Sequence, residues 1–271
     1  MIYETYAPSG DLAGLVKCYW TLEGGEPASP QRQTIVPDGC MEMIFHHGDL
    51  YRQYTGPDSY VIQPRCFVFG QLTSPLEIAP EGHTGIFSVR FLPDGFMPFA
   101  TQPVKALEDK AVSLEALYGP AGLQLSENVL GAATVTEKIG RVNAFLANRL
   151  ADTAAIDQVV RTTAAVILSM NGQLPVATLS RELAINRRQL ERRFASVIGL
   201  SPKQLSKIIR LQATLKLLLS GQFASLTDLA YEGDYYDQAH FIREFKAFTG
   251  LTPHRFYGSH LELSRLFYGA T

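Results

Sequence analysis

RRQLERRFASVIGLSP, at residues 187–202, and QAHFIREFKAFTGLTP, at residues 238–253, are two versions of one pattern. Leu190 and Phe194 of the first copy correspond to two phenylalanines of the second, and both copies end on Gly-Leu-Ser/Thr-Pro, with matched positions 51 residues apart. Apolar residues four positions apart share one face of a helix, and glycine and proline end it. The repeat therefore predicts two copies of one helical unit.

A short helical segment and a tight turn precede each copy. Asn186 and Asp237 stand at the junctions, where their side chains can cap the N-terminus of the following helix. A longer amphipathic segment between Pro202 and Gly221 connects the copies. Two helices joined by a tight turn, repeated around a connecting helix, predict paired helix-turn-helix units, which bind double-stranded DNA.

The outward face of the first copy is rich in arginine. Four arginines occur within residues 187–193. Arg188, Glu191 and Arg192 are expected on the outward face, whereas Leu190, Phe194 and Val197 belong to the inward face. Arginine suits phosphate contact and can bind guanine O6 and N7 together. The charge distribution agrees, because residues 1–160 contain 10 Lys and Arg against 18 Asp and Glu, and residues 161–271 contain 14 against 8. The alternative is that these arginines only form a solvated basic face.

Residues 174–257 resemble the DNA-binding part of the AraC/XylS family of transcription regulators. The most specific matches are Arg192-Arg193-Phe194, Gly199-Leu200-Ser201-Pro202, the run from Ile209 to Ala213, Leu229-Ala230-Tyr231 and the run from Asp237 to Phe245. The resemblance implies two recognition helices in successive major grooves, roughly 34 Å apart, held by the linker helix.

The DNA-contacting residues that this resemblance implies are Arg187, Arg188, Glu191, Arg192, Gln238, Ala239, His240 and Arg243. Two of them have alternative roles. Glu191 can stabilise its helix by pairing with a neighbouring arginine. His240 can be packed against the protein or face a phosphate.

Three positions depart from the family pattern. Ala184 stands where the family usually has the turn glycine, so the first turn is expected to be strained or rerouted. Asp234 stands at the equivalent place, with Gly233 one residue early, and aspartate tolerates a positive φ better than most residues. Ala239 replaces a common serine and leaves a methyl group that can meet thymine.

Residues 1–130 are β-rich. Turns containing glycine, proline and aspartate separate short apolar runs at residues 15–22, 41–45, 66–69 and 86–92. Many short strands with regular turns predict an antiparallel sandwich or barrel. A resemblance to the cupin-like sensor domain of such regulators rests on Val16–Trp20, Ile35–Phe45, Phe87–Gly95 and Val112–Glu115. It implies a small β-barrel with an effector pocket, whose ligand-binding residues the sequence leaves unknown.

Metal and catalytic chemistry are not expected in this domain. His46 and His47 are adjacent near a strand end, so their side chains point to opposite faces, and His83 lies in a turn. No third ligand and no nucleophile or nucleotide-binding motif accompanies them. We therefore predict no catalytic residues, no metal site and no cofactor. Arg90 lies in an apolar strand, where it either faces inward and can bind an anionic effector or is outward or structurally paired.

Targeting and redox signals are absent from the sequence. Three cysteines without a CxxC pair argue against a disulfide framework and favour reduced thiols. The apolar runs are too short to span a bilayer, and the N-terminus has no secretory signal. A cytoplasmic protein without membrane contact is therefore expected.

The predicted organisation is an α+β multidomain protein. A helical connector at residues 131–172, which could also be a dimer seam, separates the β-rich domain from an all-helical DNA-binding domain at residues 173–258, and a tail follows at 259–271. The expected function is a sequence-specific transcription regulator controlled by a small-molecule effector, with RNA polymerase and a homodimer as further partners. A ligand-independent regulator and a cupin-like enzyme fused to a DNA-binding module stay open as alternatives.

Overall fold

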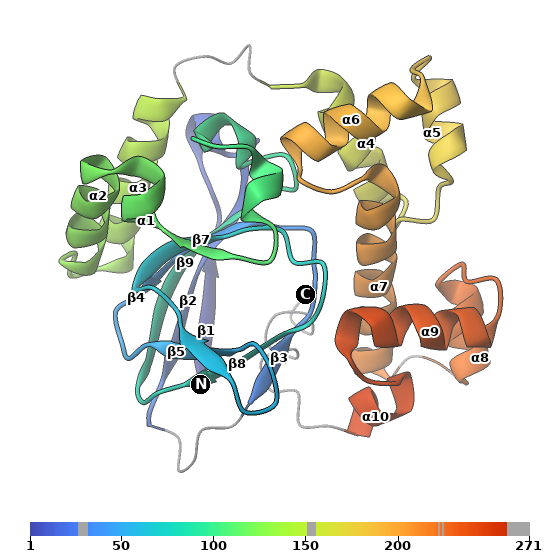
Figure 1. Cartoon of the computed structure of the whole chain (residues 1–271), viewed down its shortest axis with the longest axis horizontal. Coiled ribbons are helices and arrows are strands. Elements are labelled where there is room, and N and C mark those ends of the chain that lie inside the picture. The colour runs from blue at the N-terminus through green and yellow to red at the C-terminus, as the bar shows by residue number, and fades with distance from the viewer. Residues whose placement is uncertain (27–31, 151–155, 222, 224, 259–271) are drawn as a thin grey trace.

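The computed structural model describes residues 1–26, 32–150, 156–221, 223 and 225–258. It contains an N-terminal antiparallel β domain and a C-terminal helical domain (Figure 1). The expected α+β architecture, with β structure first and a helical second part, is confirmed.

Two antiparallel sheets build the β domain. The six-stranded sheet has the order β1-β2-β9-β4-β7-β10, and the four-stranded sheet has the order β3-β8-β5-β6. The first sheet consists of β1 (Ile2–Tyr6), β2 (Val16–Gly24), β4 (Glu42–His46), β7 (Cys66–Phe69), β9 (Thr84–Phe91) and β10 (Ala111–Ser113). The second consists of β3 (Gln33–Ile35), β5 (Tyr51–Tyr54), β6 (Tyr60–Ile62) and β8 (Leu76–Pro80).

The four apolar runs of the sequence become β2, β9, β4 and β7, which are neighbours in the six-stranded sheet. Because both faces of this sheet are covered, β9 is buried at every position. Tyr19 and Phe87 point to the face that packs with three helices, α1 (Leu114–Tyr118), α2 (Pro120–Leu130) and α3 (Val135–Arg149). Trp20 and Ile86 point to the other face, toward Tyr51 of the four-stranded sheet.

All three cysteines are free. Burial raises the pKa of the Cys40 thiol to about 12, so this side chain stays protonated at neutral pH. In the described ranges, no helix combines the length and the apolar character needed to cross a bilayer.

The helical domain is built around one long helix. Its described elements are α4 (Gln158–Ser169), α5 (Val176–Glu182), α6 (Arg187–Val197), α7 (Pro202–Ser220), α8 (Leu226–Glu232), α9 (Gln238–Thr249) and α10 (Pro253–Gly258). Leu205 and Ile208, in the first half of α7, are buried in the core of the first helix-turn-helix unit. Leu215 and Leu218, in its second half, are buried in the core of the second unit. The helix therefore holds both units in a fixed relation.

The two described helices within residues 131–172 pack in different places. Val142 and Leu146 of α3 are buried in the core of the β domain, whereas Val160 and Ala164 of α4 are buried in the core of the first helix-turn-helix unit. These apolar residues are therefore covered within the chain, while a connector with the bounds 131–172 and a dimer seam stay predictions. The predicted tail at residues 259–271 lies outside the described residues.

Candidate DNA-binding interface and internal cavity

The second helix of each unit begins at a capping side chain. Asn186 accepts a hydrogen bond from the Arg188 amide at 2.9 Å, and Asp237 accepts one from the His240 amide at 2.6 Å. The inward faces of α6 and α9 are buried and carry mainly apolar side chains, including Leu190 and Phe194 of α6. Both helices thus have one buried face and one exposed face, as the repeat predicts.

Both turns between the paired helices contain a residue with positive φ. Ala184 has φ +47° and Asp234 has φ +54°. The same hydrogen bond closes each turn, from the Ile185 amide to the Ser180 carbonyl at 3.0 Å and from the Tyr235 amide to the Ala230 carbonyl at 2.9 Å. The first turn is therefore strained and not rerouted, because Ala184 takes the conformation that suits glycine.

The offset between the two units is not uniform. Leu226, which begins α8, lies 50 positions after Val176, which begins α5, whereas Gln238 lies 51 positions after Arg187. The second turn is therefore one residue longer than the first. Tyr236 stands in this longer turn and its surface is 89% exposed. The 51-residue offset of the sequence repeat holds for the recognition helices and not for the helices before them.

The strain at Ala184 leads to a testable stability gain. Replacing Ala184 by glycine should raise the free energy of unfolding by about 0.5–1 kcal/mol, because alanine is disfavoured at positive φ and this side chain is exposed. Thermal or denaturant unfolding of the full chain measures the effect. Replacing Ala195, inside α6, by glycine should have the opposite sign. A loss of stability in Ala184→Gly would contradict the assignment of strain.

The candidate DNA-contacting residues of the first unit lie on one side of α6. Arg187, Arg188 and Arg192 are exposed. Glu191 accepts a hydrogen bond from Arg187 Nε at 3.0 Å, which is the helix-stabilising alternative for this glutamate. Arg193 is different, because its guanidinium pairs with Asp157 at 2.5 Å, where Asp157 caps α4. Only three of the four clustered arginines therefore face outward.

The candidate residues of the second unit lie at the N-terminal end of α9. Gln238, Ala239 and Arg243 are exposed. His240 is half-buried, with its ring edge-on to Tyr235 at 5.6 Å between centroids. Both alternatives for this histidine, packing and access to a phosphate, fit its position. Tyr236 is not among the site residues that the sequence predicts, because its only signal is an aromatic side chain next to the capping position Asp237.

A buried charge cluster joins α9 to α7. Glu244 of α9 is 5% exposed; it lies 2.5 Å from Arg210 Nη2 and 2.8 Å from Lys207 Nζ, and both cations belong to α7. Burial alone would raise the pKa of the Glu244 carboxyl, but the hydrogen bonds from Lys207 and Arg210 outweigh it and hold this pKa below its ordinary value. The cluster fixes the second recognition helix on the linker helix.

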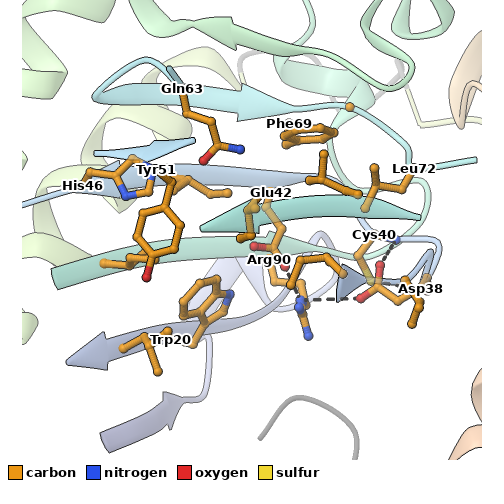
Figure 2. A pocket seen from close by; sticks show the side chains of 18 residues that line it. Trp20, Asp38, Cys40, Glu42, His46, Tyr51, Gln63, Phe69, Leu72 and Arg90 are labelled. Atoms are coloured by element: carbon orange, nitrogen blue, oxygen red, sulfur yellow. Dashed lines mark hydrogen bonds and ion pairs between the residues drawn. The ribbon is translucent and has the colours of Figure 1, made fainter. Parts of the chain in front are cut away.

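An internal cavity of about 90 Å³ lies between the two sheets (Figure 2). Most of its lining is apolar, and its polar side chains include Asp38, Glu42, Arg90, His46 and Gln63. A cavity inside this domain fits what the cupin-like resemblance implies, and its role as an effector pocket stays a prediction. Its residues come from strands of both sheets and from the loop before β4, which explains why no single sequence motif marks it.

Arg90 faces into this cavity and is also paired. Its Nε lies 2.6 Å from Glu42 Oε1 and 3.7 Å from Asp38 Oδ2 (Figure 2). The two expectations for Arg90, inward or structurally paired, are thus both realised. Because two carboxylates face one guanidinium, Arg90 is not an unoccupied anion site.

The three histidines of the β domain do not converge. His46 lies in the cavity and is 2% exposed, His47 pairs with Glu23 at 2.8 Å, and His83 Nδ1 lies 2.7 Å from the Gly24 carbonyl oxygen. Burial lowers the pKa of His46 to about 4, so its imidazole is neutral at pH 7. In the part of the chain that the structure describes, no three His, Cys, Asp or Glu side chains gather as metal ligands would.

One loop touches both the cavity and the linker helix. Val36, which lines the cavity, is also buried among the apolar residues of α7, α8 and α9. The Pro37 carbonyl accepts a hydrogen bond from Gln212 Nε2 of α7 at 2.6 Å. Gly39 has φ +77°, and a Cβ placed there would lie 2.8 Å from Leu205 of α7. The loop from Val36 to Cys40, here called the coupling loop, therefore joins the pocket wall to the DNA-binding domain.

The fold and this site define a two-domain DNA-binding transcription regulator. Residues 179–258 match the family model of a helix-turn-helix domain, and residues 4–113 match that of a domain of unknown function (DUF6597). The C-terminal part of this chain is a helix-turn-helix domain of the AraC type. No curated protein shows significant sequence similarity to the chain.

Several solved structures are similar to this chain. ToxT from Vibrio cholerae is 12% identical, with 89% of this chain and 98% of that chain covered and a TM-score of 0.48. The C-terminal domain of AraT, a response regulator from Geobacillus stearothermophilus, is 23% identical over 39% of this chain and 88% of that chain, with a TM-score of 0.37. The transcriptional regulator CdpR from Pseudomonas aeruginosa is 16% identical over 66% and 46%, with a TM-score of 0.33. These scores lie below 0.5, so the function of this chain rests on its own residues.

Proposed function

We propose that this chain is a one-component regulator whose helical domain binds a specific DNA site under the control of a small molecule in the β-domain cavity. The observation that carries the proposal is the pair of recognition helices, α6 and α9, held on one linker helix with exposed arginines on their free faces. Such a pair suits two major-groove segments one helical turn apart.

The residues proposed to contact DNA are Arg187, Arg188, Glu191, Arg192, Gln238, Ala239, His240 and Arg243. Their exposure on the free faces of α6 and α9 supports this set, with two refinements. The Arg187–Glu191 pair would position Arg187 for a phosphate. Half-buried His240 has its ring against Tyr235, so a phosphate is the contact proposed for it.

Selection of bound duplexes from a random DNA pool by the full chain tests the proposal. We expect one enriched sequence with two half-sites whose centres lie about 10 base pairs apart, because each recognition helix reads one major-groove segment. A pool that stays unenriched while the protein retains DNA would indicate binding through phosphates alone and would refute sequence-specific recognition.

Single arginine variants test the contact residues on the selected site. Arg192→Ala and Arg243→Ala should each weaken specific binding by about 1–3 kcal/mol, roughly 5- to 150-fold, and relax base preference at their own half-site. Titration of labelled duplexes at fixed salt measures this. Lys110→Ala, an exposed cation of the β domain, is the matched control and should leave affinity unchanged. Unchanged binding in both arginine variants would mean that the recognition faces are wrongly assigned.

The coupling loop supports the regulatory half of the proposal. A ligand that moves Val36, Asp38 or Cys40 in the cavity wall also moves the surface on which α7 rests. The Asp94–Arg161 ion pair, at 2.9 Å, forms a second contact between the β domain and α4. A cognate ligand should therefore change operator affinity, and identical footprints with and without it would rule out this control.

A further inference from the structure

The cavity has two polar ends separated by an apolar middle. Glu42, Ile44 and His46 alternate along β4 and all line the cavity. Four residues of strand span about 13 Å. Figure 2 shows Glu42, Arg90 and Asp38 toward one end and His46 with Gln63 and Tyr51 at the other. A ligand that fills the cavity therefore meets different chemistry at its two ends.

The first end carries more negative than positive charge. Two carboxylates, those of Asp38 and Glu42, share the single guanidinium of Arg90. Glu42 also accepts a hydrogen bond from Ser88 at 3.1 Å, and Asp38 Oδ1 accepts one from the Cys40 amide at 2.9 Å. Asp38 Oδ2 is 3.7 Å from Arg90 Nε, which is beyond hydrogen-bond distance, so this oxygen has capacity for a further donor.

Among the side chains that line this end of the cavity, two carboxylates face one cation. Lys17, which interacts electrostatically with Asp38 and whose Nζ lies 3.9 Å from the Cys40 sulfur, brings a second cation close to this end but does not line the cavity. An anionic ligand would face both carboxylates and would have to break the Arg90–Glu42 pair, which leaves a buried charge without its partner. A cationic donor also faces the Arg90 guanidinium, but it can contact Asp38 Oδ2 without breaking the Arg90–Glu42 pair.

The second end offers a neutral polar group. His46 is 2% exposed and its ring stacks on Tyr51 at 5.2 Å; the Gln63 side chain approaches the ring, but neither ring nitrogen makes a well-oriented hydrogen bond to the described residues. A buried polar group whose hydrogen bonding is incomplete is costly, and the neutral imidazole can both donate and accept. A ligand hydroxyl or carbonyl at this end would remove that cost.

We propose that the cavity binds a small amine with an apolar, preferably aromatic body, whose ammonium group contacts Asp38 and Glu42 and whose opposite end can hydrogen-bond to His46. The volume of about 90 Å³ holds roughly six to nine water-sized groups, which corresponds to one ring and a short chain. Trp20 and Ile44 line the middle, where both can pack on the apolar body. The regulatory meaning of this ligand rests on the proposed function, whereas its binding does not.

Three probes of equal shape test the ligand class on the full chain by titration calorimetry. They are a phenylpropylamine with a para hydroxyl group, the corresponding alcohol, and the corresponding propanoate. The amine should bind at least about tenfold more tightly than the alcohol, because one charge-assisted hydrogen bond is added, and the propanoate should bind most weakly. Equal or tighter binding of the propanoate, or no binding of the amine, would overturn the inference.

Isosteric variants locate the contacts. Asp38→Asn keeps an oxygen for the Cys40 amide and leaves Glu42 on Arg90, so the fold is retained while the charge is lost. It should lower the affinity of the amine by about tenfold and leave that of the alcohol unchanged. His46→Phe keeps the aromatic stack; it should weaken binding of the para-hydroxylated amine and leave binding of the same amine without the hydroxyl group unchanged. Glu77→Gln, an exposed carboxyl on β8, is the control that should change nothing.

The outcomes separate this inference from the proposed function. A protein that selects a DNA sequence but prefers the propanoate, or whose Asp38→Asn variant binds all three probes as before, refutes the amine class alone. A protein that binds the amine as described but selects no DNA sequence refutes the proposed function alone. Melting curves of each variant without probe establish that it is folded.

Discussion

Replacing Glu244 by alanine should lower the free energy of unfolding by about 3–5 kcal/mol, the cost of leaving buried cations without their counter-charge. Arg210 is the residue most affected, since its side chain is 14% exposed and its Nη2 lies 2.5 Å from the lost carboxylate. Because Glu244 ties α9 to α7, DNA binding by the second unit should fail before the chain unfolds. Denaturant unfolding and duplex titration measure the two effects.

The pH dependence of stability is an independent test of the interaction between Glu244 and its cations Lys207 and Arg210. The folded-state pKa of Glu244 is lowered, so its contribution is complete above the ordinary pKa of a glutamate and is lost as the pH falls through the folded value. The chain should therefore lose stability below about pH 4 to 5, and Glu244→Gln should make that loss of stability with falling pH shallower.

Glu232→Ala, at an exposed position of α8, is the matched control for Glu244→Ala and should change the free energy of unfolding by less than about 0.5 kcal/mol. If Glu244→Ala and Glu232→Ala lowered the free energy of unfolding equally, the buried cluster would not be what fixes α9.

Replacing Gly39 by valine should cost about 2–4 kcal/mol and loosen the contact between the coupling loop and α7. Two causes add: a β-branched residue at φ +77° is strained, and its Cβ would lie 2.8 Å from Leu205. Amide hydrogen exchange in the first half of α7 should accelerate as the loop moves away. Exchange measured by mass spectrometry, together with thermal unfolding, tests the prediction.

Gly10→Val is a control of matched strain for the coupling loop. Gly10 has φ +64° but no heavy atom within 4 Å of a Cβ placed there, so it reports the backbone cost alone. We expect it to be less destabilising than Gly39→Val and to leave exchange in α7 unchanged. If the two variants behave alike, the coupling loop does not hold α7, and the route from cavity to DNA-binding domain must be sought at Asp94 and Arg161.

The paired helix-turn-helix units could be predicted from local sequence because their determinants are local. Capping side chains, a turn residue at positive φ and apolar residues four apart are each read within a few positions, and the repeat confirms the period. The same holds for the four apolar runs that became the central strands of the six-stranded sheet. What local patterns missed in this part was the longer second turn, since one inserted residue leaves both helix patterns intact.

Roles that depend on partners distant in the sequence were decided only by the tertiary structure. Arg193 carries the same charge as Arg192 one position earlier, but its guanidinium is paired with Asp157, which lies 36 positions away in the sequence. The sequence left open whether Arg90 binds an anion or is structurally paired. In the structure it lines the cavity and is paired with Glu42 and Asp38.

Composition and periodicity by themselves determined that this protein has a β-rich domain followed by two helix-turn-helix units, because burial and helix geometry act through near neighbours along the chain. Only the tertiary structure decided which charges remain available, where the cavity lies and how the coupling loop meets α7. Those features arise where segments such as β4 and β9, or the coupling loop and α7, come together in space, and the energy of a charge depends on the groups that surround it there.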